Sequence, residues 1–265
     1  MLENPRSPRV RAVAKLTKRT ARQETGLYLL EGPQAAREAL LWRPDTLLEL
    51  YATPTAWDKH QDIRDAASDA GVEVAFSSEQ VIDAMADTVT PQGIVAVARQ
   101  VPTSVRDVFG GESRLIVICE EVRDPGNLGT IIRAADAVGA DAVILTGRTV
   151  DPFNPKVVRA TTGSLFHLPV AVGVDLADAT GRARSAGLRI VAADVGGEDF
   201  VDHRATLAEP TAWVFGNEAR GLAEDALQLV DLSLRLPIYG RAESLNLATA
   251  ASVCLYESAL AQRAT

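Results

Sequence analysis

Residues 124–135 read Asp-Pro-Gly-Asn-Leu-Gly-Thr-Ile-Ile-Arg-Ala-Ala and come shortly after the apolar run Leu115–Cys119. Asp124 suits the N-cap of a helix and Pro125 its first turn, so we expect a helix from about Asn127 to Val138. A buried strand followed by a capped helix is typical of an α/β protein.

The same alternation of short apolar runs and helical patterns continues in both directions along the 265 residues. It predicts a mostly parallel sheet with helices on its faces. The expected strands are Tyr28–Leu30, Leu47–Tyr51, Val72–Phe76, Ile94–Ala98, Leu115–Cys119, Ala142–Leu145, Leu168–Val172, Ile190–Ala193, Ala212–Phe215 and Leu232–Leu236. The expected helices are Pro33–Trp42, Ala56–Ala70, Glu79–Ala86, Asn127–Val138, Leu176–Ala186, Ala223–Leu229 and Leu245–Ala261.

Turn-forming clusters at Val101–Ser104 and Gly110–Ser113 divide the chain in two. We therefore expect a first domain at 1–100, a linker at 101–112 and a second domain at 113–265. The length suffices for two domains, each with its own core.

Composition excludes several protein classes. With 47% hydrophobic residues and two cysteines, the chain is neither disordered nor a disulfide scaffold. Cys119 and Cys254 lie among apolar residues and are expected to be buried thiols in a reducing compartment. No apolar stretch reaches 18 residues and no secretory leader is visible, so we expect a cytoplasmic protein.

Charge is unevenly distributed. Residues 1–26 carry seven basic and two acidic residues, a net charge of +5, whereas the rest of the chain carries −13. A basic arm on an acidic body indicates local contact with a polyanion. The alternative is a solvated, poorly ordered tail.

Several common catalytic motifs are missing from the sequence. It contains no P-loop, no G-x-G-x-x-G fingerprint after a strand and no G-x-S-x-G elbow. His60, His167 and His203 are far apart in sequence, so no metal site is expected. A nucleotide hydrolase, a nicotinamide oxidoreductase and a serine hydrolase are therefore disfavoured.

Three segments carry polar residues in unusual places. Arg133 stands among apolar helix residues, where it should pair with an anion or face a cleft. Residues 216–222, Gly-Asn-Glu-Ala-Arg-Gly-Leu, follow an apolar strand, where open α/β sheets bind ligands. Ser244 suits the N-cap of the last helix, whereas Asn246, one turn further in, is costly there and so has another role. Singly, each segment also fits a capped helix or a turn.

Together and in this order, the segments resemble the three motifs of the SpoU–TrmH family of RNA ribose 2′-O-methyltransferases in the SPOUT superfamily, from about Leu115 onward. Parts of residues 7–40, including Ser7-Pro8 and Leu29–Gly32, resemble that family's ribosomal-protein-like substrate-binding domain. The two-domain layout is most similar to members that act on large-subunit ribosomal RNA, including the thiostrepton-resistance type.

The resemblance implies an N-terminal ribosomal-protein-like α/β domain and a C-terminal SPOUT α/β domain with a trefoil knot. The latter would bind S-adenosyl-L-methionine and form a homodimer. The catalytic residues it implies are Asn127, Arg133, Glu218, Ser244 and Asn246. The cofactor-binding residues it implies are Thr146, Gly147, Gly216, Asn217, Gly221, Leu236, Ile238 and Leu245.

A ribose methyltransferase needs positioned groups and a route for the hydroxyl proton. Because the pKa of an arginine exceeds about 12, we expect Arg133 to grip a phosphate of the RNA rather than to act as a base. Asn127, Ser244 and Asn246 would then fix Arg133 and the reacting groups, while Glu218 would orient its loop. The residues expected to contact RNA are Arg9, Arg11, Lys15, Lys18, Arg19 and Arg22 of the arm, and Arg159 on the RNA side of the catalytic domain. For Arg159, an ordinary turn is an equally good interpretation.

Two further functions remain compatible with this sequence. One is 2′-O-methylation of transfer RNA, and the other is RNA binding by a non-catalytic relative. The latter would not need all five implied catalytic residues together.

Overall fold

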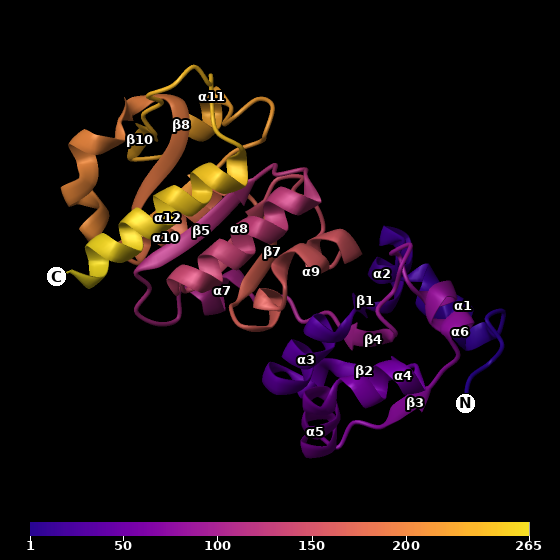
Figure 1. Ribbon diagram of the computed structural model, residues 1–265. Helices are drawn as coiled ribbons and strands as arrows, with labels where there is room; N and C mark the ends of the chain where they lie inside the picture. The colour runs from indigo at the N-terminus through magenta and orange to yellow at the C-terminus, as the bar shows by residue number, and fades with distance from the viewer. Residues whose placement is uncertain (265) are drawn as a thin grey trace. The chain divides into compact units, whose positions relative to one another are not determined.

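The computed structural model describes residues 1–264, which divide into two compact units (Figure 1). Unit 1 comprises Met1–Val101 and Asp151–His167. Unit 2 comprises Pro102–Val150 and the chain from Leu168 onward. The segment 151–167 thus packs with unit 1, although unit 2 precedes and follows it in sequence.

Unit 1 is built on a mixed four-stranded sheet. Its strands are β1 (Leu27–Glu31), β2 (Leu47–Ala52), β3 (Val74–Phe76) and β4 (Ile94–Arg99), in the order β1-β4-β2-β3. Strand β4 runs antiparallel to both neighbours, and only β2 and β3 are parallel. The expectation of a mostly parallel sheet is therefore wrong for this unit, because a helical connection can return the chain in either direction.

Alternate strand residues feed two cores on the two faces of this sheet. One face packs Leu30 and Leu50 with helices α3 (Pro33–Trp42) and α5 (Gln61–Asp69). The other face packs Leu29 with α1 (Pro8–Lys15) and α6 (Glu79–Met85). The remaining helical elements before β4 are α2 (Arg19–Thr25), η1 (Pro44–Thr46) and α4 (Pro54–Lys59). The single helix expected at Ala56–Ala70 is broken at His60, whose backbone is not helical.

The basic arm is folded. Helix α1 buries Val10 and Val13, and Leu16 follows them into the same core. Leu2 also bonds to the backbone beside β3, with its N–H donating to the carbonyl of Phe76 at 2.7 Å. These contacts exclude the poorly ordered tail.

A buried ion pair ties the segment 151–167 to the arm. Arg22 is 2% exposed, and its Nη2 and Nε donate to Oδ2 of Asp151 at 2.7 and 2.9 Å. Its Nη1 donates to the carbonyls of Leu16 and Thr17. The prediction that Arg22 contacts RNA is therefore wrong, because its guanidinium is enclosed and already paired. The segment continues through α9 (Pro155–Thr161) and η2 (Ser164–Phe166).

Unit 2 contains the expected parallel sheet. Its six strands lie in the order β10-β8-β9-β5-β6-β7, and every neighbouring pair is parallel. The strands are β5 (Leu115–Glu120), β6 (Ala142–Thr146), β7 (Val170–Val174), β8 (Arg189–Asp199), β9 (Thr211–Phe215) and β10 (Leu232–Arg235). Strands β5, β6 and β9 are almost wholly buried, as expected for strands covered on both faces.

Helices cover both faces of this sheet (Figure 1). Ile116 and Ile118 share a core with α7 (Val105–Val108), α10 (Leu176–Ser185) and α11 (Glu224–Leu227). On the opposite face, α12 (Leu247–Arg263) packs against α8 (Pro125–Val138), η3 (Phe200–Ala208) and β9. There the indole N–H of Trp213 donates to Oγ of Ser258 at 2.8 Å inside the core.

The strand order creates a switch point between β5 and β9. The connection after β5 leads to β6 on one side, whereas the connection after β9 leads to β10 on the other. In open α/β sheets, ligands bind outside the carboxyl ends of the strands at such a point. The loops that follow β5 and β9 are therefore the natural location of a site.

Candidate active site

Glu218 joins these two loops. Its carboxylate accepts hydrogen bonds from the backbone N–H of Asp124 at 2.9 Å and of Arg123 at 3.1 and 3.2 Å. It also accepts one from Nδ2 of Asn127 at 3.3 Å. The loop after β9 is thus fastened to the beginning of α8.

These bonds also fix the charge of Glu218. Partial burial raises the pKa of its carboxyl, but the N–H groups of Asp124, Arg123 and Asn127 outweigh that effect and lower the pKa overall. Glu218 is therefore an anionic acceptor at neutral pH and not a proton donor. Its contacts agree with the expected role of orienting a loop.

Asn246 links the last helix to the same place. Its Oδ1 accepts the N–H groups of Ala248 at 2.9 Å and Thr249 at 3.2 Å, and its Nδ2 donates to Oδ1 of Asn127 at 2.9 Å. Asn246 is therefore itself the N-cap of α12, which corrects the expectation that Ser244 caps a helix containing Asn246. We call the three bonded side chains the Glu218–Asn127–Asn246 network.

The loop after β9 is closed tightly on itself. Asn217 and Gly221 exchange backbone hydrogen bonds at 3.1 and 2.8 Å, and Nδ2 of Asn217 donates to the carbonyl of Glu121 at 2.9 Å. A Cβ on Gly216 would lie 2.6 Å from the backbone of Gly221, and Gly221 has φ +65°. The glycines expected to bind cofactor are thus required by the loop itself.

Glu121 is a site residue that the sequence analysis missed. It has φ +54°, and its carboxylate pairs with Arg220 at 2.8 Å and Arg123 at 3.4 Å. Partial desolvation raises the pKa of Glu121, but Arg123 and Arg220 together lower it overall. The acidic pair Glu120-Glu121, directly after an apolar strand, was the available signal.

Thr146 and Gly147 lie at the carboxyl end of β6, beside β5. The hydroxyl of buried Thr146 donates to the carbonyl of Cys119 at 3.3 Å. A Cβ on Gly147, at φ +60°, would lie 2.7 Å from Oε1 of Glu120. Both residues therefore border the carboxyl edge of the sheet, on the loop expected to hold cofactor.

The chain from Leu236 to Leu245 forms an exposed loop before α12. No backbone–backbone hydrogen bond joins it to any other residue that the structure describes. Ile238 and Leu245 are 36% and 41% exposed. Ser244 lies in this loop without a hydrogen bond to any described residue, so the structure does not bring it into the network.

Arg133 stands apart from the network on α8. It belongs to an exposed stripe with Gly126, Thr130 and Ala137, while Ile131, Ile132, Ala134 and Ala135 are buried. At 100° per residue, Arg133 leaves the helix about 120° away from Asn127 and about 9 Å further along the axis. Arg133 makes no hydrogen bond or ion pair with any described residue, so its charge is free.

The basic residues of unit 1 have different surroundings. Arg9 donates from Nε to the hydroxyl of Tyr51 at 2.7 Å and pairs with Glu49 at 3.3 Å. Of the arm residues expected to contact RNA, Arg11, Lys15, Lys18 and Arg19 have exposed side chains with no hydrogen bond or ion pair to a described residue. Arg159 packs with unit 1, and its expected contact with RNA stays a prediction.

Two kinds of feature are absent from residues 1–264. No cluster of three or more His, Cys, Asp or Glu side chains lies in a metal-binding arrangement. No helix combines the length and apolar character needed to cross a membrane.

The protein thus combines two parts. A parallel α/β unit carries a polar network at the switch point of its sheet, and a separate mixed-sheet unit precedes it in sequence. This combination defines the class of protein to which the chain should be compared. The sequence model of the SpoU rRNA Methylase family matches residues 114–256, and that of the MRM3-like substrate binding domain matches residues 7–96. The chain belongs to the SpoU rRNA methylase family.

Particular relatives match almost the whole chain. The 23S rRNA (guanosine(2553)-2′-O)-methyltransferase RlmP of Bacillus subtilis (strain 168) is 32% identical over 96% of this chain and 97% of its own length. An AdoMet-bound rRNA methyltransferase from Sinorhizobium meliloti has a TM-score of 0.83 at 33% identity, covering 97% of this chain and 96% of that one. The SpoU methyltransferase AviRb from Streptomyces viridochromogenes, in complex with AdoMet, has a TM-score of 0.83 at 28% identity, covering 98% and 100%.

Proposed function

We propose that this protein transfers a methyl group from S-adenosyl-L-methionine to a ribose 2′-hydroxyl of large-subunit ribosomal RNA. The observation that carries the proposal is the Glu218–Asn127–Asn246 network, which joins all three sequence motifs at the switch point of the sheet. Relatives named as 23S rRNA 2′-O-methyltransferases match this chain over both units, which supports the substrate class.

The residues around the switch point fit the cofactor. The loop 236–245 offers free backbone N–H and carbonyl groups next to the apolar side chains of Ile238 and Leu245. Adenine and an amino-acid group require this combination of hydrogen bonds and apolar contact. Thr146-Gly147 and Gly216-Asn217 with Gly221 would border the same space, and Leu236 would complete it. When bound, the cofactor supplies an electrophilic methyl on sulfur.

The network has a positioning role in this reaction. Glu218 holds the loop after β9 against α8, and Asn246 holds the start of α12 against Asn127. Three loops are thereby fixed around one place, as in-line methyl transfer requires. Ser244, on the loop before α12, has a free hydroxyl that can orient the ribose.

Arg133 binds the RNA phosphate beside the reacting ribose. Its guanidinium is exposed and unpaired, so it can make a bidentate contact with that phosphate. The positive charge would also lower the pKa of the 2′-hydroxyl and so favour loss of its proton. Arginine cannot itself act as a neutral base at this position.

A second copy of this chain completes the site. Helix α12 carries an exposed apolar stripe, Val253, Tyr256 and Leu260, which are 40%, 48% and 64% exposed. Such a stripe is suited to a C-terminal homodimer interface. Because Arg133 points away from Asn127 within one copy, we propose that it serves the network of the partner. We also propose that unit 2 forms the trefoil knot that the family resemblance implies.

Mixed dimers test this arrangement. Arg133→Ala and Asn246→Ala copies with different tags are co-expressed, and the mixed species is isolated. We expect each parent to be inactive and the mixed dimer to recover activity at one of its two sites. Absence of recovery would show that both residues serve the same copy.

The protein is expected to work in the cytoplasm, where its buried thiols stay reduced; burial raises the pKa of Cys119 to about 12.

The function is tested with labelled S-adenosyl-L-methionine and total RNA from a strain lacking this gene. We expect one new 2′-O-methylated nucleotide in large-subunit ribosomal RNA. Label in transfer RNA would favour the alternative substrate, and cofactor binding without transfer to any RNA would contradict catalysis.

A further inference from the structure

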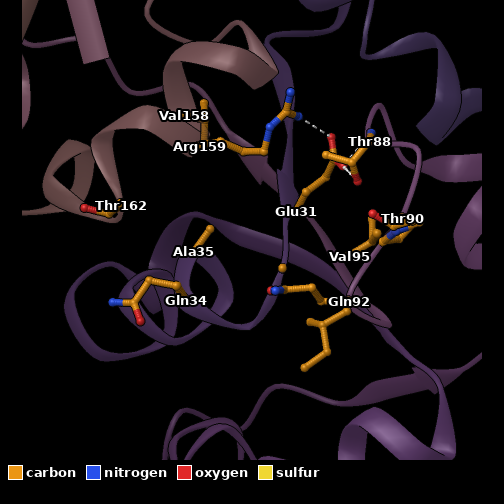
Figure 2. Close-up of a pocket in the computed structure, with 13 residues that line it drawn as sticks. Glu31, Gln34, Ala35, Thr88, Thr90, Gln92, Val95, Val158, Arg159 and Thr162 are labelled. Atoms are coloured by element: carbon orange, nitrogen blue, oxygen red, sulfur yellow. Dashed lines mark hydrogen bonds and ion pairs between the residues drawn. The ribbon is translucent and has the colours of Figure 1, made fainter. Parts of the chain in front are cut away.

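Unit 1 contains a cavity of about 320 Å³, which the function of unit 2 leaves unexplained (Figure 2). This volume is at the lower end of the range for small-ligand pockets, about 300–1,000 Å³. The cavity is bordered by the start of α3, the loop 88–92, strand β4 and one side of α9. It belongs entirely to unit 1 because α9 packs there.

The charges at this cavity are already neutralised. Arg159 donates from Nη1 to Glu31 at 2.9 Å and from Nη2 to Asp87 at 3.0 Å. Figure 2 shows the first of these bonds, with Thr88 on the other side of the Glu31 carboxylate. Glu31 also accepts the N–H groups of Asp87 and Thr88 and the hydroxyl of Thr88, at 2.9–3.1 Å. Two carboxylates facing one guanidinium would repel a phosphate, so a neutral ligand is favoured.

The floor of the cavity is apolar. Ala35, Ile94 and Val158 line it and belong to one core, whereas Val95, which also borders the cavity, faces the core on the other side of the sheet. On the adjoining loop, Val89 is 98% exposed. Because the floor side chains are at most 6% exposed, a ligand there would be held mainly at its edge, by the polar groups of the rim.

Free hydrogen-bonding groups stand at the rim. Gln92, Thr90 and Thr162 border the cavity, and none of the three side chains bonds to a described residue. The Gln92 amide lies close over Gly32, where a Cβ would be 3.2 Å from its Oε1. Because an amide offers a donor and an acceptor side by side, it can bind the edge of a base in bidentate fashion.

We propose that this cavity receives one unpaired nucleobase of the RNA substrate, an inference that rests on the proposed RNA function. The base would lie on the apolar floor with its edge bonded to Gln92. Glu31 and Arg159 act as positioning residues, which hold the loop 87–92 and α9 around it. Single-stranded RNA is commonly recognised through such exposed bases.

The test compares base binding with phosphate binding on the full chain, without cofactor. The probes are RNA decamers of A, of C, of U and of alternating G and U, together with inorganic polyphosphate of ten phosphates. Gln92→Ala is the cavity variant, Gln61→Ala is a matched control on α5 outside the cavity, and Lys18→Ala is the phosphate control. Melting temperatures confirm that each variant is folded.

We expect at least one decamer to bind more tightly than polyphosphate, and Gln92→Ala to weaken that decamer about 5-fold to 100-fold. The slope of log affinity against log salt should stay unchanged for Gln92→Ala, whereas Lys18→Ala should reduce it by about 1. Equal binding by wild type and Gln92→Ala, a reduced slope in Gln92→Ala, or no preference for RNA over polyphosphate would overturn the proposal. Methyl transfer is assayed separately. Failure of the proposed function, with base binding retained, can therefore be distinguished from failure of base binding, with methyl transfer retained.

Discussion

Arg22 on helix α2 of unit 1 and Arg133 on helix α8 of unit 2 have opposite surroundings. Arg22 is 2% exposed and donates to Asp151 and to two backbone carbonyls. Arg133 is exposed and has no partner among residues 1–264. The first arginine holds segment 151–167 in unit 1, and the second is free to bind a ligand. Pairing with other residues, more than position in a helix, distinguishes the two arginines.

The largest effect on stability is expected at Arg22. Arg22→Ala leaves the Asp151 carboxylate, 16% exposed, without its cation and removes two hydrogen bonds to backbone carbonyls, so it should destabilise unit 1 by about 3 kcal/mol. Hydrogen exchange should rise across 151–167 while β9 in unit 2 stays protected.

Arg19→Ala is the matched control, because Arg19 lies on the same helix, is exposed and has no partner among the described residues. Its effect on stability should be near zero. If Arg22→Ala were as stable as Arg19→Ala, the buried pair would not be what holds the segment.

A smaller, pH-dependent effect is expected at Glu218. Because its pKa is lowered in the folded protein, its contribution to stability is complete above the ordinary glutamate pKa of about 4.3 and is lost as pH falls through the lower folded value. Glu218→Gln should therefore cost at most about 1 kcal/mol at pH 7, since the group is solvent-screened, and nothing once the pH has fallen below the lowered pKa of the folded state. Urea unfolding at several pH values measures this gap.

The same variant should slow methyl transfer by up to about 100-fold, because Asn127 loses an anionic partner that positions it. A constant stability gap from pH 3 to pH 7 would contradict the role assigned to the charge.

The smallest effect is expected on the arm. Lys18 is exposed and unpaired among described residues, so Lys18→Ala should weaken RNA binding only about 2-fold to 5-fold. Charge substitution is preferable to deletion of residues 1–26, because α1 contributes Val10 and Val13 to the core. A titration with labelled RNA at several salt concentrations checks the value; unchanged affinity would remove Lys18 from the RNA surface.

Unit 2 was more predictable than unit 1 for a physical reason. Its strands are buried on both faces and read as continuous apolar runs, and Asp124 caps α8 as expected, with its Oδ1 accepting the N–H of Asn127 at 2.8 Å. In unit 1, the alternation of helices and strands fixed neither the direction of β4 nor the break at His60.

The site was predictable in part. Glu218, Asn127 and Asn246 come together although 119 residues separate the last two, because the motif order carries information that periodicity lacks. The partner of Arg22 lies 129 residues away, which no local pattern could reveal. Asn246 shows a different limit of prediction from sequence, because its single side chain both caps α12 and bonds to Asn127.

The proposed function requires that unpaired Arg133 acts in methyl transfer and not in folding or cofactor binding. Transfer of label to RNA, binding of S-adenosyl-L-methionine and melting temperature should be measured together on wild type and Arg133→Ala. We predict that transfer falls at least about 1,000-fold, while cofactor affinity and melting temperature stay close to wild type. Near-normal transfer by Arg133→Ala would contradict the account.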